Sequence, residues 1–236
     1  MTKYTQIAND IRNQIVKKMV QANEQLPFEK DLCIKYKASK MTVKKALDIL
    51  VAEGLIVKRR GSGTFVKSIS NSDMTRLLVS NQFRGLTALY SDHKVDSKLL
   101  EFVVVTSSKD VKNKLNLQND EFLYNILRVR YLDTEPFVIE NTYMPINLIS
   151  GLKKQHAEGS IYAYIEDKLG LKIQSSHRTI TVRKSTKMEQ KYLNLEDNDP
   201  VAVVEQVAYL ESGVAFEYSI SVHRYDRFAF ETVIVR

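Results

Sequence analysis

The sequence predicts an α+β protein in two parts: a basic, mainly helical N-terminal domain that ends in a β-hairpin, and a larger domain built on an antiparallel β-sheet. Charge is the first observation, because residues 1–70 contain 14 Lys and Arg against 6 Asp and Glu, whereas residues 71–236 contain 21 against 22. Periodicity is the second, because apolar residues recur at helical spacing in the first third and at strand spacing in most of the remainder. The third is a polar, serine-rich stretch at residues 67–73, which is typical of a linker.

Composition limits the class of protein. With 236 residues and a hydrophobic fraction of 44%, the chain is long enough to bury a core. Cys33 is the single cysteine, so no internal disulfide can form, which fits a reducing compartment. No signal peptide is visible at the N-terminus, and no run approaches the ~18 apolar residues of a membrane span. We therefore expect a soluble, cytoplasmic protein with no membrane partner.

Three helices are predicted in the first domain. The first covers residues 4–20, and its apolar stripe consists of Ile7, Ala8, Ile11, Ile15 and Met19. Pro27 suits the first turn of a second helix that runs to about residue 36. Ser39 is a good N-cap for a third helix, which Gly54 ends. The buried face of this third helix is formed by Val43, Ala46, Leu47, Leu50 and Val51.

A short β-hairpin follows the third helix. The runs Leu55-Ile56-Val57 and Thr64-Phe65-Val66 are separated by charged residues and by Gly61-Ser62-Gly63. Three helices and this hairpin together predict a winged helix-turn-helix domain over residues 1–67, with a linker at 68–81 and a second domain at 82–236.

The first turns of the third helix carry basic side chains that point away from its apolar face. A helix N-terminus also attracts phosphate through its free N–H groups, and the basic hairpin could reach a neighbouring groove. These features predict sequence-specific binding to double-stranded DNA. The alternative is a solvated basic face on a winged helix that binds protein. The candidate DNA-binding residues are Lys30, Ser39, Lys40, Met41, Thr42, Lys44, Lys45, Arg59, Arg60 and Gly61.

The same residues resemble the DNA-binding domain of the GntR family of bacterial regulators. The matching pieces are Leu26-Pro27-x-Glu29, Ser39-Lys40-Met41-Thr42-Val43-x-x-Ala46-Leu47, Glu53-Gly54-Leu55-Ile56 and Gly61-Ser62-Gly63-Thr64-Phe65-Val66. The resemblance implies that Lys30, Lys40 and Lys44 contact DNA, at positions where the family usually has arginine. Lysine cannot make the two-pronged guanine contact of a guanidinium, so we expect weaker guanine readout or a preference for A·T-rich sequence. Phe28 stands where a capping serine is usual, so the second helix is expected to begin differently.

The second domain reads as an antiparallel sheet with helices on one side. Strands are expected at residues 102–106, 123–132, 137–144, 180–182, 201–210 and 215–223, and short helices at 160–169 and 187–193. Arg128 and Arg130 are two apart in one strand and therefore lie on one face, where they repel each other unless an anion lies between them. In the last strand, Glu217, Ser219, Ser221 and His223 share the face opposite Phe216, Tyr218, Ile220 and Val222. These faces predict a polar cavity for an anionic, hydroxyl-rich ligand.

This region resembles the UTRA effector-binding domain of the HutC subfamily, whose fold is similar to chorismate lyase. The matching pieces are Gly85-Leu86-Thr87, Arg128-x-Arg130, Glu135-Pro136, Ile139-Glu140, Pro145, Ser160-Ile161-Tyr162, Phe216-Glu217-Tyr218 and His223-Arg224-x-Asp226-Arg227-Phe228. By position, the resemblance implies that a phosphate is held by Thr87, Arg128, Arg130 and Ser160. It implies that sugar hydroxyls are held by Glu140, Tyr162, Glu217 and His223. A structural ion pair with an arginine is the alternative for Glu140, and a satisfied hydrogen-bonding role is the alternative for His223.

We expect a homodimeric transcriptional regulator, a repressor that binds a pseudo-palindromic operator and responds to a small anionic metabolite such as a sugar phosphate. No catalytic residues, metal site or cofactor are expected. Two alternatives remain at this point. An enzyme could use the arginines and a glutamate to bind and cleave an anionic substrate, although no catalytic set is visible. A general nucleic-acid binder would need no metabolite.

Overall fold

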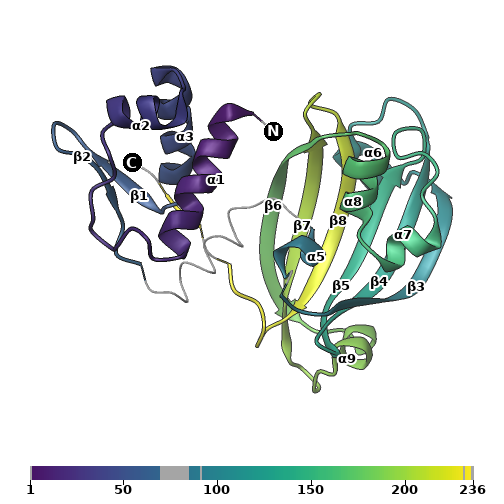
Figure 1. Ribbon diagram of the computed structural model, residues 1–236. Coiled ribbons are helices and arrows are strands. Elements are labelled where there is room, and N and C mark those ends of the chain that lie inside the picture. Colours follow the sequence, from purple (N-terminus) through teal and green to yellow (C-terminus); the bar gives the residue numbers. More distant parts are fainter. Residues whose placement is uncertain (1, 70–84, 91, 231, 235–236) are drawn as a thin grey trace. The chain divides into compact units, whose positions relative to one another are not determined.

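A computed structural model describes residues 2–69, 85–90, 92–230 and 232–234. The chain forms two compact units, Met1–Gln82 together with Phe230–Arg236, and Phe83–Ala229 (Figure 1). Residues 70–81 of the predicted linker lie outside the described residues, and the domain boundaries stay a prediction. In the described part of the chain, no helix is both long enough and apolar enough to cross a membrane.

The described residues of the first unit form three helices and a two-stranded hairpin, as predicted (Figure 1). The elements are α1 (Lys3–Val16), α2 (Glu29–Tyr36), α3 (Lys40–Ala52), β1 (Ile56–Arg59) and β2 (Gly63–Val66). Helices α1 and α3 bury their apolar stripes against each other and against Leu26, Leu32 and Leu55. The strands β1 and β2 pair antiparallel from Ile56↔Val66 to Arg59↔Gly63, which places charged residues of β1 on an exposed surface. This unit is a winged helix-turn-helix.

Helix α1 ends four residues earlier than the sequence predicted. Val16 is its last residue, Lys17 caps it, and Lys18 adopts a left-handed backbone conformation with φ 56°. Met19 therefore leaves the buried stripe and is 69% exposed. The prediction that Met19 belongs to the buried stripe was wrong, because the helix ends before it and the turn at Lys18 directs the chain away from the core.

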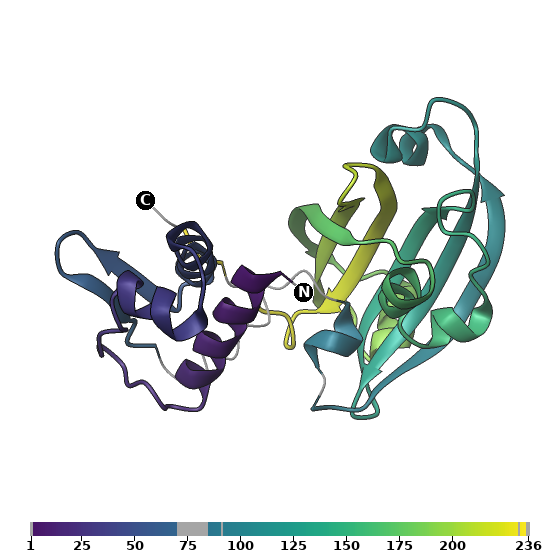
Figure 2. The same ribbon diagram turned by 45° about the horizontal axis from the view of Figure 1, so that its top comes forward.

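The second unit is built on six antiparallel strands in the order β3-β4-β5-β8-β7-β6. The strands are β3 (Val95–Thr106), β4 (Phe122–Leu132), β5 (Glu135–Pro145), β6 (Ile173–Lys184), β7 (Pro200–Leu210) and β8 (Ala215–Arg224). The sheet is twisted and curved (Figure 2), and β3 and β6 are its edges. The helices are α5 (Leu86–Leu89), α6 (Lys109–Leu115), α7 (Lys154–Glu158), α8 (Ile161–Ala163), the π-helical turn η1 (Tyr164–Lys168) and α9 (Lys187–Leu193).

Helices pack on both faces of this sheet, which corrects the expectation of one covered face. Helices α7 and α8 pack on the face that carries Tyr124 and Ile126. Helix α6 packs on the opposite face with Leu123, and α9 packs there with Val129. Successive residues of β4 thus alternate between two cores, as the two-residue period of a strand requires.

The alternation predicted for the last strand holds except at Phe216. The register runs from Ala208↔Glu217 directly to Tyr209↔Ala215, so Phe216 is the extra residue of a β-bulge. Phe216 is fully buried with Ile161 and Ile165, and its ring lies 6.0 Å from that of Tyr162. The bulge therefore directs Phe216 toward α8, on the face that Glu217 shares, and not toward the opposite face.

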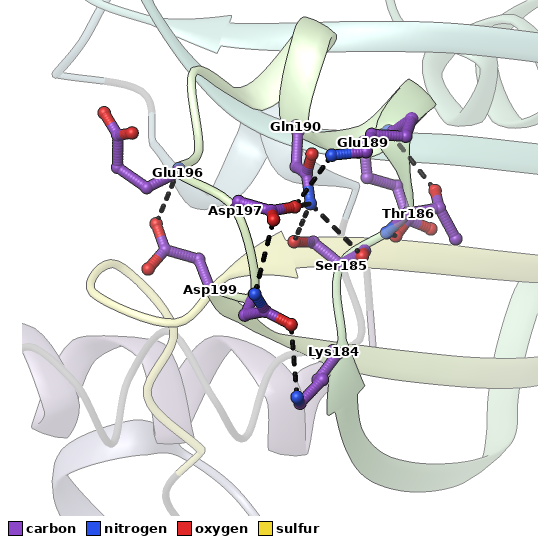
Figure 3. Close-up of polar contacts among 10 residues, drawn as sticks. Lys184, Ser185, Thr186, Glu189, Gln190, Glu196, Asp197 and Asp199 are labelled. Carbon is purple, nitrogen blue, oxygen red and sulfur yellow. Dashed lines mark hydrogen bonds and ion pairs between the residues drawn. The ribbon is translucent and has the colours of Figure 1, made fainter.

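Helix α9 occupies the predicted residues because its start is fixed by side chains (Figure 3). Thr186 and Glu189 form a reciprocal capping box, in which each side chain accepts a hydrogen bond from the other residue's backbone N–H. Gln190 donates to Ser185 Oγ at 3.2 Å and to Asp197 at 3.3 Å, which joins the two chain segments that flank the helix. This corner of the sheet is held by local polar contacts.

Candidate nucleic-acid interface and ligand site

The N-terminal turn of α3 is held by its cap. Ser39 Oγ accepts a hydrogen bond from the Thr42 N–H at 3.2 Å and lies 2.9 Å from Thr42 Oγ1. Buried Val43 and Leu47 fix the opposite face of the helix in the core. Four exposed side chains consequently project from the first turns: Lys40, Met41, Lys44 and Lys45.

The structure divides the predicted cations into two groups. Lys45 Nζ lies 4.1 Å from the centre of the Tyr4 ring, and the Arg59 guanidinium lies 4.6 Å from that of Phe65. Lys58 Nζ is 2.7 Å from Asp48 Oδ1. The contacts found among the described residues engage none of the remaining cations, which are Lys30, Lys40, Lys44 and Arg60. These four are the side chains most available to a phosphate backbone.

The tip of the hairpin is shaped by glycine and supported by the start of α2. Gly61 adopts φ +75°, which a side chain would disfavour. Gly63 lies against the Gln25 amide, which also donates to the Ser62 carbonyl at 2.8 Å. Phe28 approaches the same glycine, with its Cε1 3.5 Å from where a Cβ would lie. As expected, α2 begins without a side-chain cap at Phe28, whose ring lies beside the hairpin instead.

The predicted ligand residues of the second unit form rows across one face of the sheet. Paired residues on neighbouring antiparallel strands point to the same side. One row is Ser97↔Arg130↔Val138↔His223. The next is Leu99↔Arg128↔Glu140↔Ser221. A third is Thr142↔Ser219↔Gln206↔Arg178. The register thus brings together arginines and hydroxyls that are far apart in the sequence.

The two arginines of the site have different partners. Arg128 Nε donates to Glu140 Oε2 at 2.7 Å, and its Nη1 donates to the carbonyls of Ala157 and Gly159 at 2.6 and 3.3 Å. Arg130 Nη2 donates to Thr87 Oγ1 at 2.8 Å, whereas its Nε, although buried, has no hydrogen-bond partner among the described residues. Arg128 therefore ties the sheet to the turn before α8, and Arg130 retains a free donor.

Burial and the polar or charged neighbours have opposite effects on the pKa values of the two carboxylates. Burial alone would raise the pKa of Glu140, but the charges of Arg128 and Arg130 and the hydrogen bond from Arg128 together lower it. Burial raises the pKa of Glu217, which accepts hydrogen bonds from Gln206 at 3.0 Å and from Ser219 at 2.8 Å. Burial also lowers the pKa of Arg130 to about 10, so its guanidinium stays charged at neutral pH.

His223 is kept neutral by its surroundings. Burial lowers the pKa of its imidazole to about 4, with a smaller opposing effect from Glu140. Its ring packs against Phe228 and Phe137, with centroids 4.9 and 5.9 Å away. The buried Nδ1 has no partner in the described part of the chain. His223 thus combines a packing role with a buried polar atom that has no partner among the described residues, in the same row of the sheet as Arg130.

Ser160 and Tyr162 enter the site from α8. Ser160 caps this helix, since its Oγ accepts from the Ala163 N–H at 3.2 Å. Gly85, just before α5, lies against the Tyr162 ring, and a Cβ added to this glycine would lie 3.6 Å from the ring. Burial raises the pKa of Tyr162 well above its usual value, as does the neighbouring Glu217. The chain before Thr87 and the start of α8 therefore meet over the sheet.

Sequence reasoning missed the residue that connects this half of the site. Gln206 Nε2 donates to Glu217 Oε1 at 3.0 Å and lies 3.3 Å from the Tyr162 hydroxyl, while its Oε1 accepts from Arg178 Nε at 2.6 Å. Ser97, whose buried hydroxyl has no partner among the described residues, was also missed. Gln206 is a polar residue within an apolar strand, which was a usable signal, whereas nothing local distinguishes Ser97.

Comparison with known proteins matches both units. The model of bacterial regulatory proteins of the gntR family matches residues 3–66, and the UTRA domain model matches residues 91–229. The HTH-type transcriptional regulator GmuR of Bacillus subtilis is 39% identical over the full length of both chains. The mannosyl-D-glycerate transport/metabolism system repressor MngR of Escherichia coli is 30% identical, covering 99% of this chain and 96% of its own.

A solved structure agrees over both units. The crystal structure of the possible transcriptional regulator YydK from Bacillus subtilis has a TM-score of 0.82 and 29% identity. The match covers 97% of this chain and 99% of the YydK chain. The predicted fold, a winged helix-turn-helix followed by an antiparallel-sheet UTRA domain, is thereby confirmed.

Proposed function

The chain belongs to the GntR family of bacterial regulatory proteins and carries a UTRA effector domain, and on this basis we propose that a sugar phosphate, or a similarly anionic sugar derivative, controls its binding to an operator. Its relatives are transcriptional regulators, so the chain is a regulator and not an enzyme. The regulator is a repressor that acts in the cytoplasm and releases DNA when the effector binds.

The operator is gripped by the start of α3 and by the hairpin. Lys40 and Lys44 contact phosphates or base edges beside the helix, while Lys30 and Arg60 neutralise the backbone on either side. Ser39 and Thr42 add hydroxyl contacts, and Gly61 lets the hairpin tip approach a groove wall. Lys45 and Arg59, which lie over aromatic rings, contribute less.

The observation that carries the effector proposal is the free donor of Arg130. Arg130 is 2% exposed, and its buried Nε has no hydrogen-bond partner among the described residues. It lies in one row of the sheet with Ser97 and His223. A buried guanidinium donor without a partner is costly unless a ligand satisfies it, and phosphate or carboxylate oxygens do so best. Thr87 and Ser160 complete the anion site, and Arg128 holds the turn that presents Ser160.

The sugar hydroxyls lie toward the carboxylates. Glu140, Glu217, Tyr162 and His223 can each exchange hydrogen bonds with hydroxyl groups. The name of MngR refers to mannosyl-D-glycerate, which supports a sugar-derived effector for this chain as well. Effector binding would then change the arrangement of α5 and α8 around the site. A coupling free energy between the effector site and the DNA-binding surface, typically ~1–3 kcal/mol, would weaken DNA binding.

The second copy of the homodimer joins at a sheet edge. Among the described strands, β6 pairs only with β7, and Val182 on it is 72% exposed, the most of any aliphatic side chain in the sheet. Antiparallel pairing of two β6 strands would satisfy the unpaired backbone groups of this edge. Light scattering tests this: Val182→Lys should halve the mass of the wild-type dimer, and Val214→Lys, in an exposed turn, should not. A monomeric wild type would contradict it.

The effector proposal is tested with the purified protein, a panel of phosphosugars and other metabolite anions, and the Arg130→Met variant. A ligand far above its dissociation constant raises the melting temperature of the wild type. The same ligand should release operator DNA from the wild type but from Arg130→Met only at much higher concentration. Arg227→Met, which changes an arginine outside the predicted site, is the control. Equal responses of wild type and Arg130→Met to that ligand would refute the site.

A further inference from the structure

One apolar side chain on α3 is fully separated from the core. Met41 is 73% exposed, whereas Val43, Ala46, Leu47 and Leu50 of the same helix are at most 1% exposed. Met41 lies in the first turn, and Lys40 and Lys44 on either side of it in the sequence are also exposed. A single exposed apolar side chain is ordinary on a protein surface. Met41 matters because of its place, since it stands among the basic residues of α3 that the proposed function assigns to DNA.

The basic side chains around Met41 supply affinity with little sequence information. A lysine ammonium is a point charge with rotatable donors, and it cannot make the fixed two-pronged contact of a guanidinium with guanine. Phosphate contacts position a protein on DNA and do not identify bases. Lys40 and Lys44 therefore discriminate between bases less sharply than guanidinium groups would, which leaves room for direct readout by other side chains of the helix tip.

Thr42 and Met41 also belong to this turn, and their side chains differ in conformational freedom. Thr42 Oγ1 lies 2.9 Å from Ser39 Oγ and Thr42 N–H donates to the same atom, so the cap restrains this side chain. Met41 has no such contact with the described residues and has three rotatable bonds with which to fit a surface. Other exposed apolar side chains lie elsewhere: Phe28 beside the hairpin, Ile34 on α2, and Met19 beyond α1.

We propose that Met41 reads the 5-methyl group of a thymine in the major groove and is the principal base-discriminating residue of α3. The thymine methyl is the apolar group on the edges of the four bases in that groove, and apolar side chains recognise it by contact. The Met41 side chain covers the methyl and removes both surfaces from water. The inference rests on the proposed DNA binding and specifies which base the helix prefers.

The test begins with selection of duplexes from a random library by the wild-type protein at moderate salt. Each thymine specified in the selected sequence is then replaced singly by uracil, which removes the methyl and leaves the hydrogen-bonding edge unchanged. At one thymine in each half-site, the wild type should lose affinity by about fourfold, the amount expected for one buried methyl. Met41→Ala should bind that thymine duplex more weakly but show no further loss with uracil. Met41→Leu should keep most of the difference.

Met19→Ala is the control, because Met19 is similarly exposed, at 69%, outside α3. It should respond to uracil as the wild type does. If every thymine-to-uracil change is neutral for the wild type, or if Met41→Ala loses as much as the wild type on the change, the inference about Met41 is wrong while DNA binding stands. If the wild type selects no duplex at all, the proposed function itself fails.

Discussion

Arg128 Nε and Glu140 Oε2 lie 2.7 Å apart between neighbouring strands, and the second arginine, Arg130, reaches the same carboxylate oxygen at 3.7 Å. One carboxylate therefore compensates the charges of two arginines whose side chains are 8% and 3% exposed. Glu140→Gln should lower the free energy of unfolding by about 3 kcal/mol, because it leaves two buried like charges without a counterion. Denaturant titration measures this. Glu211→Gln, which breaks the surface pair with Lys172, should leave the midpoint unchanged, and equal effects of both variants would contradict the interpretation.

Acid should destabilise the protein through His223. Its pKa is lowered from 6.5 to about 4 on folding, so between these values the unfolded chain binds more protons than the folded protein. The contribution of His223 to the free energy of unfolding is fully present above the unfolded pKa. It is lost as pH falls, by roughly 3 kcal/mol at about pH 4. His223→Phe keeps a ring against Phe137 and Phe228 and removes the titration.

The measurement for His223 is the difference in unfolding free energy between wild type and His223→Phe at several pH values. The wild type should lose stability relative to the variant as pH falls from 7 toward 4. Glu217, whose raised pKa has the opposite sign, is present in both proteins and cancels in the difference. A difference that does not vary with pH would show that His223 is not buried in its neutral form.

Local signals account for what the sequence predicted well. Ser39 and the apolar spacing behind it located α3, and the helix expected at 187–193 coincides with α9, whose start the structure shows to be fixed by the Thr186 and Glu189 box. Helix α6 was missed although Ser108 caps it and Val111 and Leu115 form its buried pair, so the signal was present but short. The first half of β6 was missed because it is an edge strand whose exposed polar residues do not alternate.

The ligand site needed information that no local pattern contains. The shared face of Arg128 and Arg130 followed from their spacing, but the partners that separate their roles come from β5, α7 and α5. The place of Gln206 depends on the registers of β6, β7 and β8 together. The bulge at Phe216 changes the face of one residue without any change in composition, so alternation alone gave the wrong side.

The C-terminal segment should support the end of α3 through Gly54. This residue is buried with φ +77°, and an added Cβ would lie 2.6 Å from Val233 Cγ2. Gly54→Ala should cost about 1–2 kcal/mol from the backbone conformation and more from the collision. Gly61→Ala is a matched control, because its φ is +75° with no atom near the added Cβ. Adding Val233→Ala to Gly54→Ala should restore the part of the stability that the collision removes. Thermal unfolding of the wild type, Gly54→Ala, Gly61→Ala and the double variant measures this. If the double variant is no more stable than Gly54→Ala, Val233 does not lie against Gly54.

Two adjacent lysines of α3 should differ in their dependence on salt. Lys44 is exposed and unengaged by any contact found among the described residues, whereas Lys45 Nζ lies 4.1 Å from the centre of the Tyr4 ring. Removing a side chain that neutralises one phosphate lowers the slope of log affinity against log salt by about 1. Lys44→Ala should therefore flatten this slope by about that amount, and Lys45→Ala should change it much less. Fluorescence anisotropy with one selected duplex over a range of salt concentrations measures both slopes. Equal flattening would mean that Lys45 leaves Tyr4 to bind phosphate, and that the ring contact does not separate the two side chains.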